Sequence, residues 1–314
     1  MKKISILVPV YNEEDVLNEF YNVLTEVIDS LNAYQFEILF VDDGSTDNSI
    51  NIIKTLRAKD ARVSYVKLSR NFGKEIALIA GMDYIAGDAV IIMDADLQHR
   101  PEIIPELIEY WNEGYDDVYI KREKREGESF FKKTTSTLYY KLLQKMTNVS
   151  VLENAGDFRL LDRRCVNALK KMRESQRYTK GLYSLIGYKK KPVIYSTAPR
   201  AAGKTKWNYV KLIDLAVDGI TSFSIYPLRL ASITGIIVSF CSFIYMAVVI
   251  FKKLCFGEVV RGYPTIVSLI LFLGGIQLIC LGVIGEYIGR IFYETKQRPL
   301  YFVDEYNDKK EMNT

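Results

Sequence analysis

The sequence predicts an α/β fold, a mostly parallel sheet with helices on both faces, followed by two helices that cross a membrane. Three observations support this prediction. Strand-length apolar runs alternate with amphipathic segments as far as residue 121, acidic side chains follow the ends of those runs, and residues 230–251 and 265–285 are long, apolar and uncharged. Strand–helix alternation is typical of a parallel sheet covered by helices, which binds ligands beyond the carboxyl ends of its strands.

The strands are expected where apolar runs of the right length occur, at residues 4–10, 36–41, 63–68, 89–93 and 117–120. A helical spacing of apolar residues separates the first two runs: Leu17, Phe20, Tyr21, Leu24, Ile28 and Leu31. The next helix is expected to begin with Thr46 as its N-cap and Asp47 in its first turn. A further helix should start near Pro101 and end at Gly114.

The composition limits the class of partner. The chain has 314 residues, of which 49% are hydrophobic and 25% are charged, an ordinary balance for a globular protein. Its formal net charge of +4 is too small to predict nucleic-acid binding, but many cations cluster between residues 121 and 206. That placement favours an anionic partner at one face, such as a phosphate or a lipid surface. The four cysteines have neither metal-ligand nor disulfide spacing, and Cys165 is expected to be a reduced core thiol.

Both apolar segments reach the length of about 20 residues that a bilayer span requires, and a soluble core helix would normally show a polar face. Cations before the first span and after the second favour cytoplasmic termini, although the loop between them is basic as well. Before the first span, residues 208–229 have an imperfect apolar face. We expect this helix either to lie in the membrane interface or to pack on the soluble domain. The short apolar run after Lys3 is expected to be a strand and not a signal peptide.

These features divide the chain into four expected parts. Residues 1–207 form a cytoplasmic globular domain, residues 208–229 a juxtamembrane amphipathic helix, residues 230–285 a two-helix transmembrane domain, and residues 286–314 a cytoplasmic tail. The protein is therefore expected in the cytoplasmic membrane as a multi-pass protein.

Acidic and amide side chains follow four of the expected strands, in "PVYNEE", "VDDGSTDNS", "LSRNFGK" and "MDADLQH". Because parallel strands end at the same edge of a sheet, these side chains should converge. Asp94 and Asp96 would point to one side of an extended segment, with Gln98 continuing the alternation. Two carboxylates suit Mg²⁺, which completes its shell with water and substrate phosphates. The plainer alternative is a solvated loop after a core strand.

Asp42 and Asp43 suit a different role. A carboxylate at the end of a buried strand can accept a hydrogen bond from a nucleobase N–H, while Gly44 permits a tight turn. The same residues could also form only a turn followed by a helix cap.

"PVYNEE", "VDDGSTDNS" and "DADLQHRP", in this order and spacing, resemble the family 2 glycosyltransferases of the GT-A fold. "SRNFGKEIA", "GDFRLLDRR", "RAAGKTKW" and the two apolar segments resemble, more narrowly, the polyprenyl-phosphate glycosyltransferases. These include bactoprenol glucosyltransferases and dolichol-phosphate mannose synthases. The resemblance covers essentially the whole chain, and its combined motifs are highly specific.

The resemblance implies a role for each matching residue. The nucleotide pocket would be lined by residues from the strand ends: Pro9, Tyr11, Asn12, Glu13, Asp42, Asp43, Lys74 and Asp94. Mg²⁺ or Mn²⁺ and the donor diphosphate would be held by Asp94, Asp96 and Gln98. The other catalytic residues would be Asp157, on the acceptor side, and Arg200 and Lys204, on a mobile loop that contacts phosphate. The acceptor phosphate would be bound by Arg122, Arg125, Lys132 and Arg159.

The implied activity is inverting transfer of a hexose from a nucleotide sugar to polyprenyl (undecaprenyl) phosphate at the cytoplasmic membrane face, for cell-envelope glycan modification. UDP-glucose is the expected donor, while UDP-galactose, a modified UDP-pentose and GDP-mannose stay open. The resemblance also implies a homo-oligomer, such as a tetramer. A processive polysaccharide synthase would carry Q-x-x-R-W, whereas Trp111 and Trp207 follow Tyr110 and Lys206. The alternative from another class is a membrane-tethered nucleotide-sugar binding protein without catalysis.

Overall fold

The computed structural model describes residues 1–98, 100–122, 155–175, 177–195, 221, 224–256, 262–307 and 309–310. In this described part, nine strands form one sheet in the order β7-β5-β6-β4-β1-β2-β3-β8-β9. Its four central strands are parallel to one another: β1 (Lys2–Val10), β2 (Tyr34–Asp42), β3 (Val63–Leu68) and β4 (Ala89–Ile92). These strands and β5 (Asp117–Arg122) confirm the five strands expected from the apolar runs.

The sheet is mixed outside its parallel centre. Strand β6 (Ala155–Asp162) pairs antiparallel with both β4 and β5, so it separates the fifth run from the parallel block. Strand β7 (Lys190–Tyr195) pairs parallel with β5 at that edge. At the other edge, β8 (Val303–Tyr306) pairs antiparallel with β3 and is followed by the short β9 (Lys309–Lys310). Residues of the expected C-terminal tail therefore complete the sheet of the globular domain.

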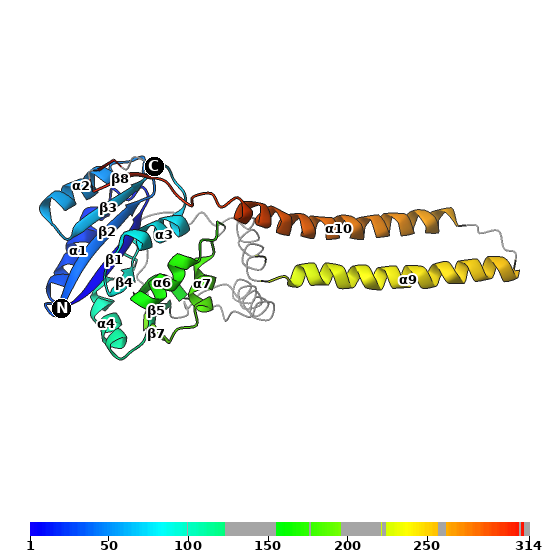
Figure 1. Ribbon diagram of the computed structural model, residues 1–314, viewed down its shortest axis with the longest axis horizontal. Coiled ribbons are helices and arrows are strands. Elements are labelled where there is room, and N and C mark those ends of the chain that lie inside the picture. The colour runs from blue at the N-terminus through cyan, green and yellow to red at the C-terminus, as the bar shows by residue number, and fades with distance from the viewer. Residues whose placement is uncertain are drawn as a thin grey trace.

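Helices cover both faces of the sheet (Figure 1). One face carries α1 (Leu17–Asp29), α2 (Ser49–Lys59) and α4 (Ile104–Asn112), which follows the 3-10 turn η1 (Pro101–Ile103). The other face carries α3 (Lys74–Tyr84), α6 (Arg163–Lys171) and α7 (Thr179–Leu185). The α4 region starts and ends as expected, since Pro101 opens η1 and Gly114 follows α4 with a φ of 89°.

Helix α2 begins later than the sequence predicts. Its N-cap is Asn48, because the backbone amide of Thr46 donates to Asn12 Oδ1 at 2.8 Å and the Asp47 carboxylate accepts from the amide of Ser49. Residues 45–48 thus form a turn that is held against the segment following β1, and the helix starts only after that turn.

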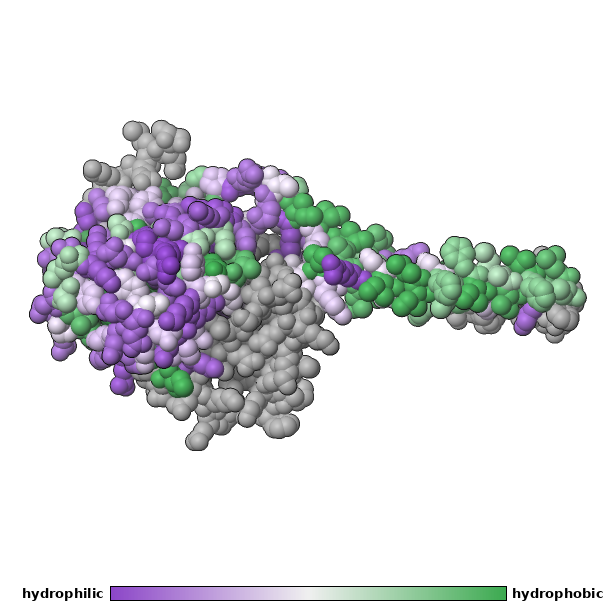
Figure 2. Space-filling view, turned by 60° about the horizontal axis from the view of Figure 1, so that its bottom comes forward, coloured by the Kyte–Doolittle hydropathy of each residue, from purple (hydrophilic) through white to green (hydrophobic). Residues whose placement is uncertain are grey.

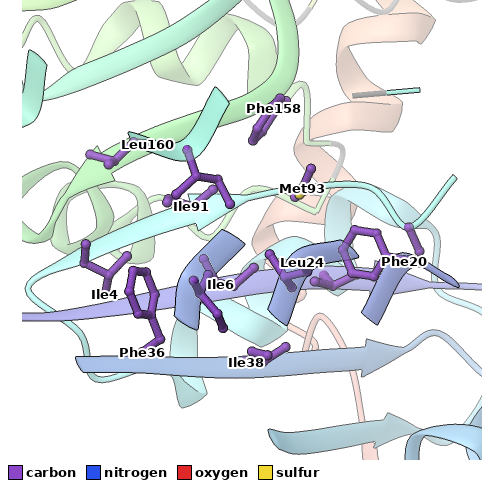
Figure 3. Packing of buried hydrophobic residues seen from close by; sticks show 14 of the residues in the cluster. Ile4, Ile6, Phe20, Leu24, Phe36, Ile38, Ile91, Met93, Phe158 and Leu160 are labelled. Carbon is purple, nitrogen blue, oxygen red and sulfur yellow. The ribbon is translucent and has the colours of Figure 1, made fainter. Parts of the chain in front are cut away.

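The core follows from the two-residue period of the strands. In β1, Ile4, Ile6 and Val8 belong to the cluster under α1, α2 and α4, whereas Leu7 belongs to the cluster under α3, α6 and α7. Figure 3 shows the first cluster, in which Phe20 of α1 lies over the strand residues. Two fully buried apolar layers hold the central strands rigid, so the strand ends are fixed in position.

The two apolar segments form long helices that extend side by side from the globular domain (Figure 1), namely α9 (Tyr226–Phe256) and α10 (Tyr263–Thr295). Within them, Tyr226–Lys252 and Phe272–Thr295 are long and apolar enough to cross a membrane, and none of their span windows is buried in the structure. Their surface is largely hydrophobic, in contrast to the globular domain (Figure 2). These helices are candidate membrane spans. Most of the expected amphipathic helix at 208–229 lies outside the described residues.

Candidate active site

The acidic strand ends converge at one edge of the sheet. Val10 is in register with Asp42, and Leu7 is in register with Ile92, so the segments that follow β1, β2 and β4 leave the sheet together. Helix α3 begins at the same edge, directly after the loop that follows β3. The register therefore gathers the residues that the sequence predicts for the nucleotide and the metal.

Lys74 joins two of these carboxylates. Its Nζ lies 2.7 Å from Asp94 Oδ1, 2.8 Å from Asp94 Oδ2 and 2.9 Å from Asp157 Oδ2. Burial alone would lower the pKa of Lys74, but Asp94 and Asp157 outweigh it and raise that pKa above its ordinary value. Lys74 therefore stays an ammonium, which links the segment after β4 to β6.

Glu13 adds a further negative charge. Burial raises the pKa of the Glu13 carboxyl, and the carboxylates of Asp96, Asp94 and Asp47 raise it further. Glu13 thus lies within electrostatic range of both aspartates of the D-x-D motif. This edge of the sheet is electrostatically suited to a cation.

Asp96 and Gln98 lie in a turn and not in an extended strand. Strand β4 ends at Ile92, Leu97 has a φ of 55°, and Asp96 Oδ1 accepts a hydrogen bond from the Gln98 amide at 3.1 Å. The alternation expected for these residues does not apply, because the chain turns before it reaches Asp96. Gln98 is 9% exposed.

The carboxylate pair can be tested as a metal site by its donor chemistry. Asp94 and Asp96 are hard oxygen donors, which fit Mg²⁺ or Mn²⁺. Among the residues that the structure describes, no group of three or more His, Cys, Asp and Glu side chains could hold a metal ion. The carboxylates of Asp94 and Asp96 therefore fit an ion that takes only one or two ligands of this kind from the protein.

Asp42 and Asp43 have different environments. Asp42 is fully buried, and in the described part of the chain its Oδ2 has no hydrogen-bond partner. Burial raises the pKa of the Asp42 carboxyl, although hydrogen bonds from Ser45 oppose this. Asp43 instead accepts from the backbone amides of Phe72 and Gly73, at 2.7 and 2.8 Å. Of these two carboxylates, Asp42 is therefore the one with an oxygen, Oδ2, that accepts no hydrogen bond from the described residues.

The loop before α3 lies tightly against Gly44. A Cβ at Gly44 would come within 2.4 Å of the Arg70 carbonyl carbon, and Gly44 has a φ of 68°. This close approach brings the amides of Phe72 and Gly73 to Asp43, and it sets the start of α3. Asp43 thus positions Lys74.

The segment after β1 is held by the turn before α2. Asn12 has a φ of 56°, its amide donates to Ser45 Oγ at 3.0 Å, and its side-chain oxygen accepts from Thr46. Pro9 is half-buried, whereas Tyr11 is 45% exposed. Asn12 therefore shapes the pocket edge, and the Tyr11 ring is open to a ligand.

Arg159 does not fit its expected contact with an acceptor phosphate. Its side chain is 1% exposed, and Nη1 lies 3.2 Å from Asp117 Oδ2 in the core. Its guanidinium also lies 3.5 Å from the centre of the Tyr183 ring. Asp117 and Tyr183 are not among the residues predicted from the sequence, although an aspartate at the start of an apolar strand indicates a buried carboxylate that needs a partner.

The remaining predicted site residues lie wholly or partly outside the described residues. Arg200, Lys204, Arg125 and Lys132 lie outside the described residues, and so does the side chain of Arg122, at the end of β5. Their roles stay predictions.

Comparisons with known proteins agree with this architecture. The model of glycosyl transferase family 2 matches residues 5–169, and that of the GtrB C-terminal hairpin matches residues 226–291. An uncharacterized glycosyltransferase of Synechocystis sp. is 47% identical over 96% of this chain and 95% of its own length. A prophage bactoprenol glucosyl transferase homolog of Escherichia coli is 47% identical, and the bactoprenol glucosyl transferase of Shigella phage SfV is 46% identical, each over 96% of this chain and 98% of its own length.

Among solved structures, glucosyl-3-phosphoglycerate synthase from Mycobacterium tuberculosis, in complex with Mn²⁺, UDP-glucose and phosphoglyceric acid, is similar with a TM-score of 0.47. It is 19% identical, over 70% of this chain and 78% of that one. The family match covers most of β1, the strands β2 to β6, the helices α1 to α4 and most of α6, and the hairpin match covers α9 and most of α10. The chain therefore belongs to glycosyltransferase family 2, as a glycosyltransferase with a GT-A domain and a C-terminal helix hairpin of the kind found in GtrB.

Proposed function

We propose that this protein transfers glucose from UDP-glucose to a polyprenyl phosphate, with inversion, at the cytoplasmic face of the membrane. The observation that carries the proposal is the strand register that brings the segments holding Glu13, Asp94 and Asp96 to one sheet edge, in a chain that also has an apolar helix hairpin. The names of the bactoprenol glucosyl transferases, which match nearly the whole chain, support glucose as the sugar and a polyprenyl carrier as the acceptor.

The donor nucleotide would bind at the end of β2. Asp42 Oδ2 is a buried acceptor without a partner among the described residues, and a nucleobase N–H would satisfy it. The exposed Tyr11 ring could stack on the base. Both contacts suit a uracil, and UDP-galactose, a modified UDP-pentose and GDP-mannose are the competing donors to screen.

Asp94 and Asp96, with Gln98 beside them, would hold Mg²⁺ or Mn²⁺ together with the donor diphosphate. When bound, such an ion acts as a Lewis acid that stabilises charge on the diphosphate. Arg200 and Lys204 are proposed to add positive charge to the same leaving group. The carboxylates of this chain thus anchor the donor, and its cations stabilise the leaving group.

The acceptor needs little activation. A phosphate monoester has a second pKa of about 6, so it is mostly ionised at neutral pH. One of its oxygens attacks the anomeric carbon from the face opposite the nucleotide, and the bond to the diphosphate oxygen breaks with its electron pair. No proton has to move, so Asp157 is proposed to orient groups at the acceptor side. Arg122, Arg125 and Lys132 are the proposed ligands of the acceptor phosphate.

The connection of the hairpin to the globular domain supports part of the proposed orientation. Ser175 donates to Glu294 Oε1 through its amide and hydroxyl, at 2.8 and 2.7 Å, and β8 then joins the sheet beside β3. The domain and the last turn of α10 are thereby held together. This contact supports the proposal that the catalytic site and the residues after the hairpin lie on the same side of the membrane.

The test is a transfer assay with the full chain in lipid nanodiscs, undecaprenyl phosphate and radiolabelled UDP-glucose. The expected result is a glucose-labelled, organic-soluble lipid whose mass is confirmed by mass spectrometry. Nucleotide-sugar binding without such a lipid, from any of the four donors, would favour the non-catalytic alternative. The homo-oligomer implied by the family resemblance is tested on the same sample by light scattering.

A further inference from the structure

We propose that the ammonium of Lys74 occupies the cation position at Asp94 in the free enzyme, so that the divalent ion binds together with the nucleotide diphosphate and not before it. This inference rests on the proposed function, because it assigns an order of binding at the same site.

The first step is the geometry of Lys74. Its Nζ lies within 2.8 Å of both oxygens of Asp94, so a single ammonium already pairs with the carboxylate that is proposed to hold the ion. A divalent ion that approached the free protein would have to displace this ammonium, or accept a like charge beside it. Either event weakens binding of the ion alone.

The second step is the balance of charge around the ammonium. Asp157 Oδ2 lies 2.9 Å from Lys74 Nζ, and Glu13 lies within electrostatic range of Asp94 and Asp96. Without a cation these carboxylates would repel one another. Lys74 supplies a positive charge that relieves this repulsion in the free enzyme.

The third step is that Lys74 can leave Asp94 without being left unpaired. A lysine carries its charge on a flexible stem, and this side chain is 40% exposed. Once the ion takes Asp94, the ammonium keeps Asp157 and gains the donor phosphates as partners. The nucleotide diphosphate therefore supplies both the missing ligands of the ion and a new partner for Lys74.

The consequence is that donor arrival changes the partners of Lys74. Lys74 bridges Asp94 and Asp157 in the free state, and it shifts toward Asp157 and the phosphates in the loaded state. Lys74 is thus a positioning residue, which links the donor site at Asp94 to Asp157 on the acceptor side.

The experiment measures binding of Mn²⁺ to the full chain in nanodiscs by electron paramagnetic resonance, with and without UDP. For the wild type we expect Mn²⁺ to bind at least about tenfold more tightly with UDP. In Lys74→Met, the affinity for Mn²⁺ without UDP should rise by about tenfold. The difference between the Mn²⁺ affinities with and without UDP should therefore be smaller than in the wild type. Lys74→Arg keeps the positive charge, so its Mn²⁺ affinities with and without UDP should differ as much as those of the wild type. Lys74→Gln repeats the test if the Met variant folds poorly.

Lys54→Met is the matched control, because Lys54 also forms an ion pair, 2.8 Å from Glu305, with a side chain that is 37% exposed. It should leave the affinity for Mn²⁺ unchanged. Equal Mn²⁺ affinity without UDP in the wild type, Lys74→Met and Lys74→Gln overturns the inference. A failure of Mn²⁺ to bind even with UDP would instead overturn the metal assignment in the proposed function.

Discussion

Arg159 and Asp117 form an ion pair inside the sheet, where guanidinium Nη1 lies 3.2 Å from both carboxylate oxygens. The Arg159 side chain is 1% exposed and that of Asp117 is 0% exposed. Nη2 also donates to the Gly156 carbonyl at 2.9 Å. The pair joins β5 to β6 only two residues from Asp157, so it supports the acceptor side of the site from within the core.

Removing this arginine should destabilise the protein. Arg159→Met leaves the Asp117 carboxylate buried without its partner, a change that typically costs about 3–5 kcal/mol. We expect the melting temperature to fall by roughly 10 °C. Thermal unfolding of the protein in detergent, monitored by intrinsic fluorescence, measures this change. Because Asp117→Asn with Arg159→Met removes both charges, the double variant should recover part of the loss. If Arg159→Met melts like the wild type but binds the acceptor weakly, the original prediction that Arg159 binds the acceptor phosphate would be correct.

Asp42 and Asp43 should respond differently to the same substitution. Asp42→Asn alters the buried acceptor proposed for the nucleobase, so KM for the donor should rise by about 10- to 100-fold with a smaller change in kcat. Asp43→Asn weakens the bonds to the Phe72 and Gly73 amides and should lower the melting temperature instead. Steady-state kinetics and thermal melts of both variants check this. Equal effects on KM would refute the division of roles.

Much of the fold is predictable from the sequence, because each central strand is a largely apolar run whose apolar side chains are buried on both faces of the sheet. Strand β6 has no such run, since Asp157 and Arg159 interrupt it. Strand β8 reads "VDEY" and depends on distant partners, such as the bond from Lys54 to Glu305 across 251 positions. No local pattern can reveal a strand that is stabilised by residues so far away.

The candidate site shows the same division. The location of Asp42 and Asp94 is predictable, because Asp42 ends one buried parallel strand and Asp94 follows another. Which of Asp42 and Asp43 keeps a free oxygen is not predictable, since the amides that bind Asp43 come from the loop before α3. The contact between Lys74 and Asp157 joins α3 to a strand that the pattern missed. Only the assembled sheet brings these two side chains together.

Asp96→Ala should abolish transfer while the protein still folds and inserts in the membrane. Asp96 is one of the two carboxylates proposed to hold the ion, and it lies in a turn whose loss leaves the strands intact. We expect a fall in rate of at least about 100-fold, measured as labelled lipid, with an unchanged melting temperature. Metal-dependent activity retained in this variant would refute the metal assignment.

The C-terminal strand should stabilise the globular domain through Glu305. Glu305 accepts hydrogen bonds from the Lys54 ammonium at 2.8 Å and from the Tyr65 hydroxyl at 2.5 Å. Glu305→Ala removes a 15% exposed carboxylate and should cost about 2 kcal/mol in unfolding free energy. Asp304→Ala is the control on the same strand, since its ion pair with Lys67 is more exposed and should contribute less than about 1 kcal/mol. Similar losses in the two variants would contradict this role for Glu305.

The rate of transfer should fall as the pH decreases below about 6, because the acceptor phosphate then becomes protonated. Asp157 does not explain such a fall. Burial would raise its pKa, but Lys74 and Lys180 outweigh burial and hold the pKa of Asp157 below its ordinary value. Its carboxylate therefore stays ionised throughout the pH range in which the phosphate titrates. The stability that the folded state gains from this carboxylate is present above its ordinary pKa, and is lost only as the pH falls through the lowered value.

A pH–rate profile between pH 5 and 8 separates the two groups, with a thermal melt at each pH to show that the protein stays folded. An acceptor analogue whose second pKa is lower should move the acid limb by the same amount, because the titrating group belongs to the lipid. Lys74→Arg, which changes the cation next to Asp157 but not the acceptor, should leave the midpoint of that limb in place. If the midpoint of the acid limb shifts in Lys74→Arg but not with the acceptor analogue, the titrating group is Asp157, and it acts as a base.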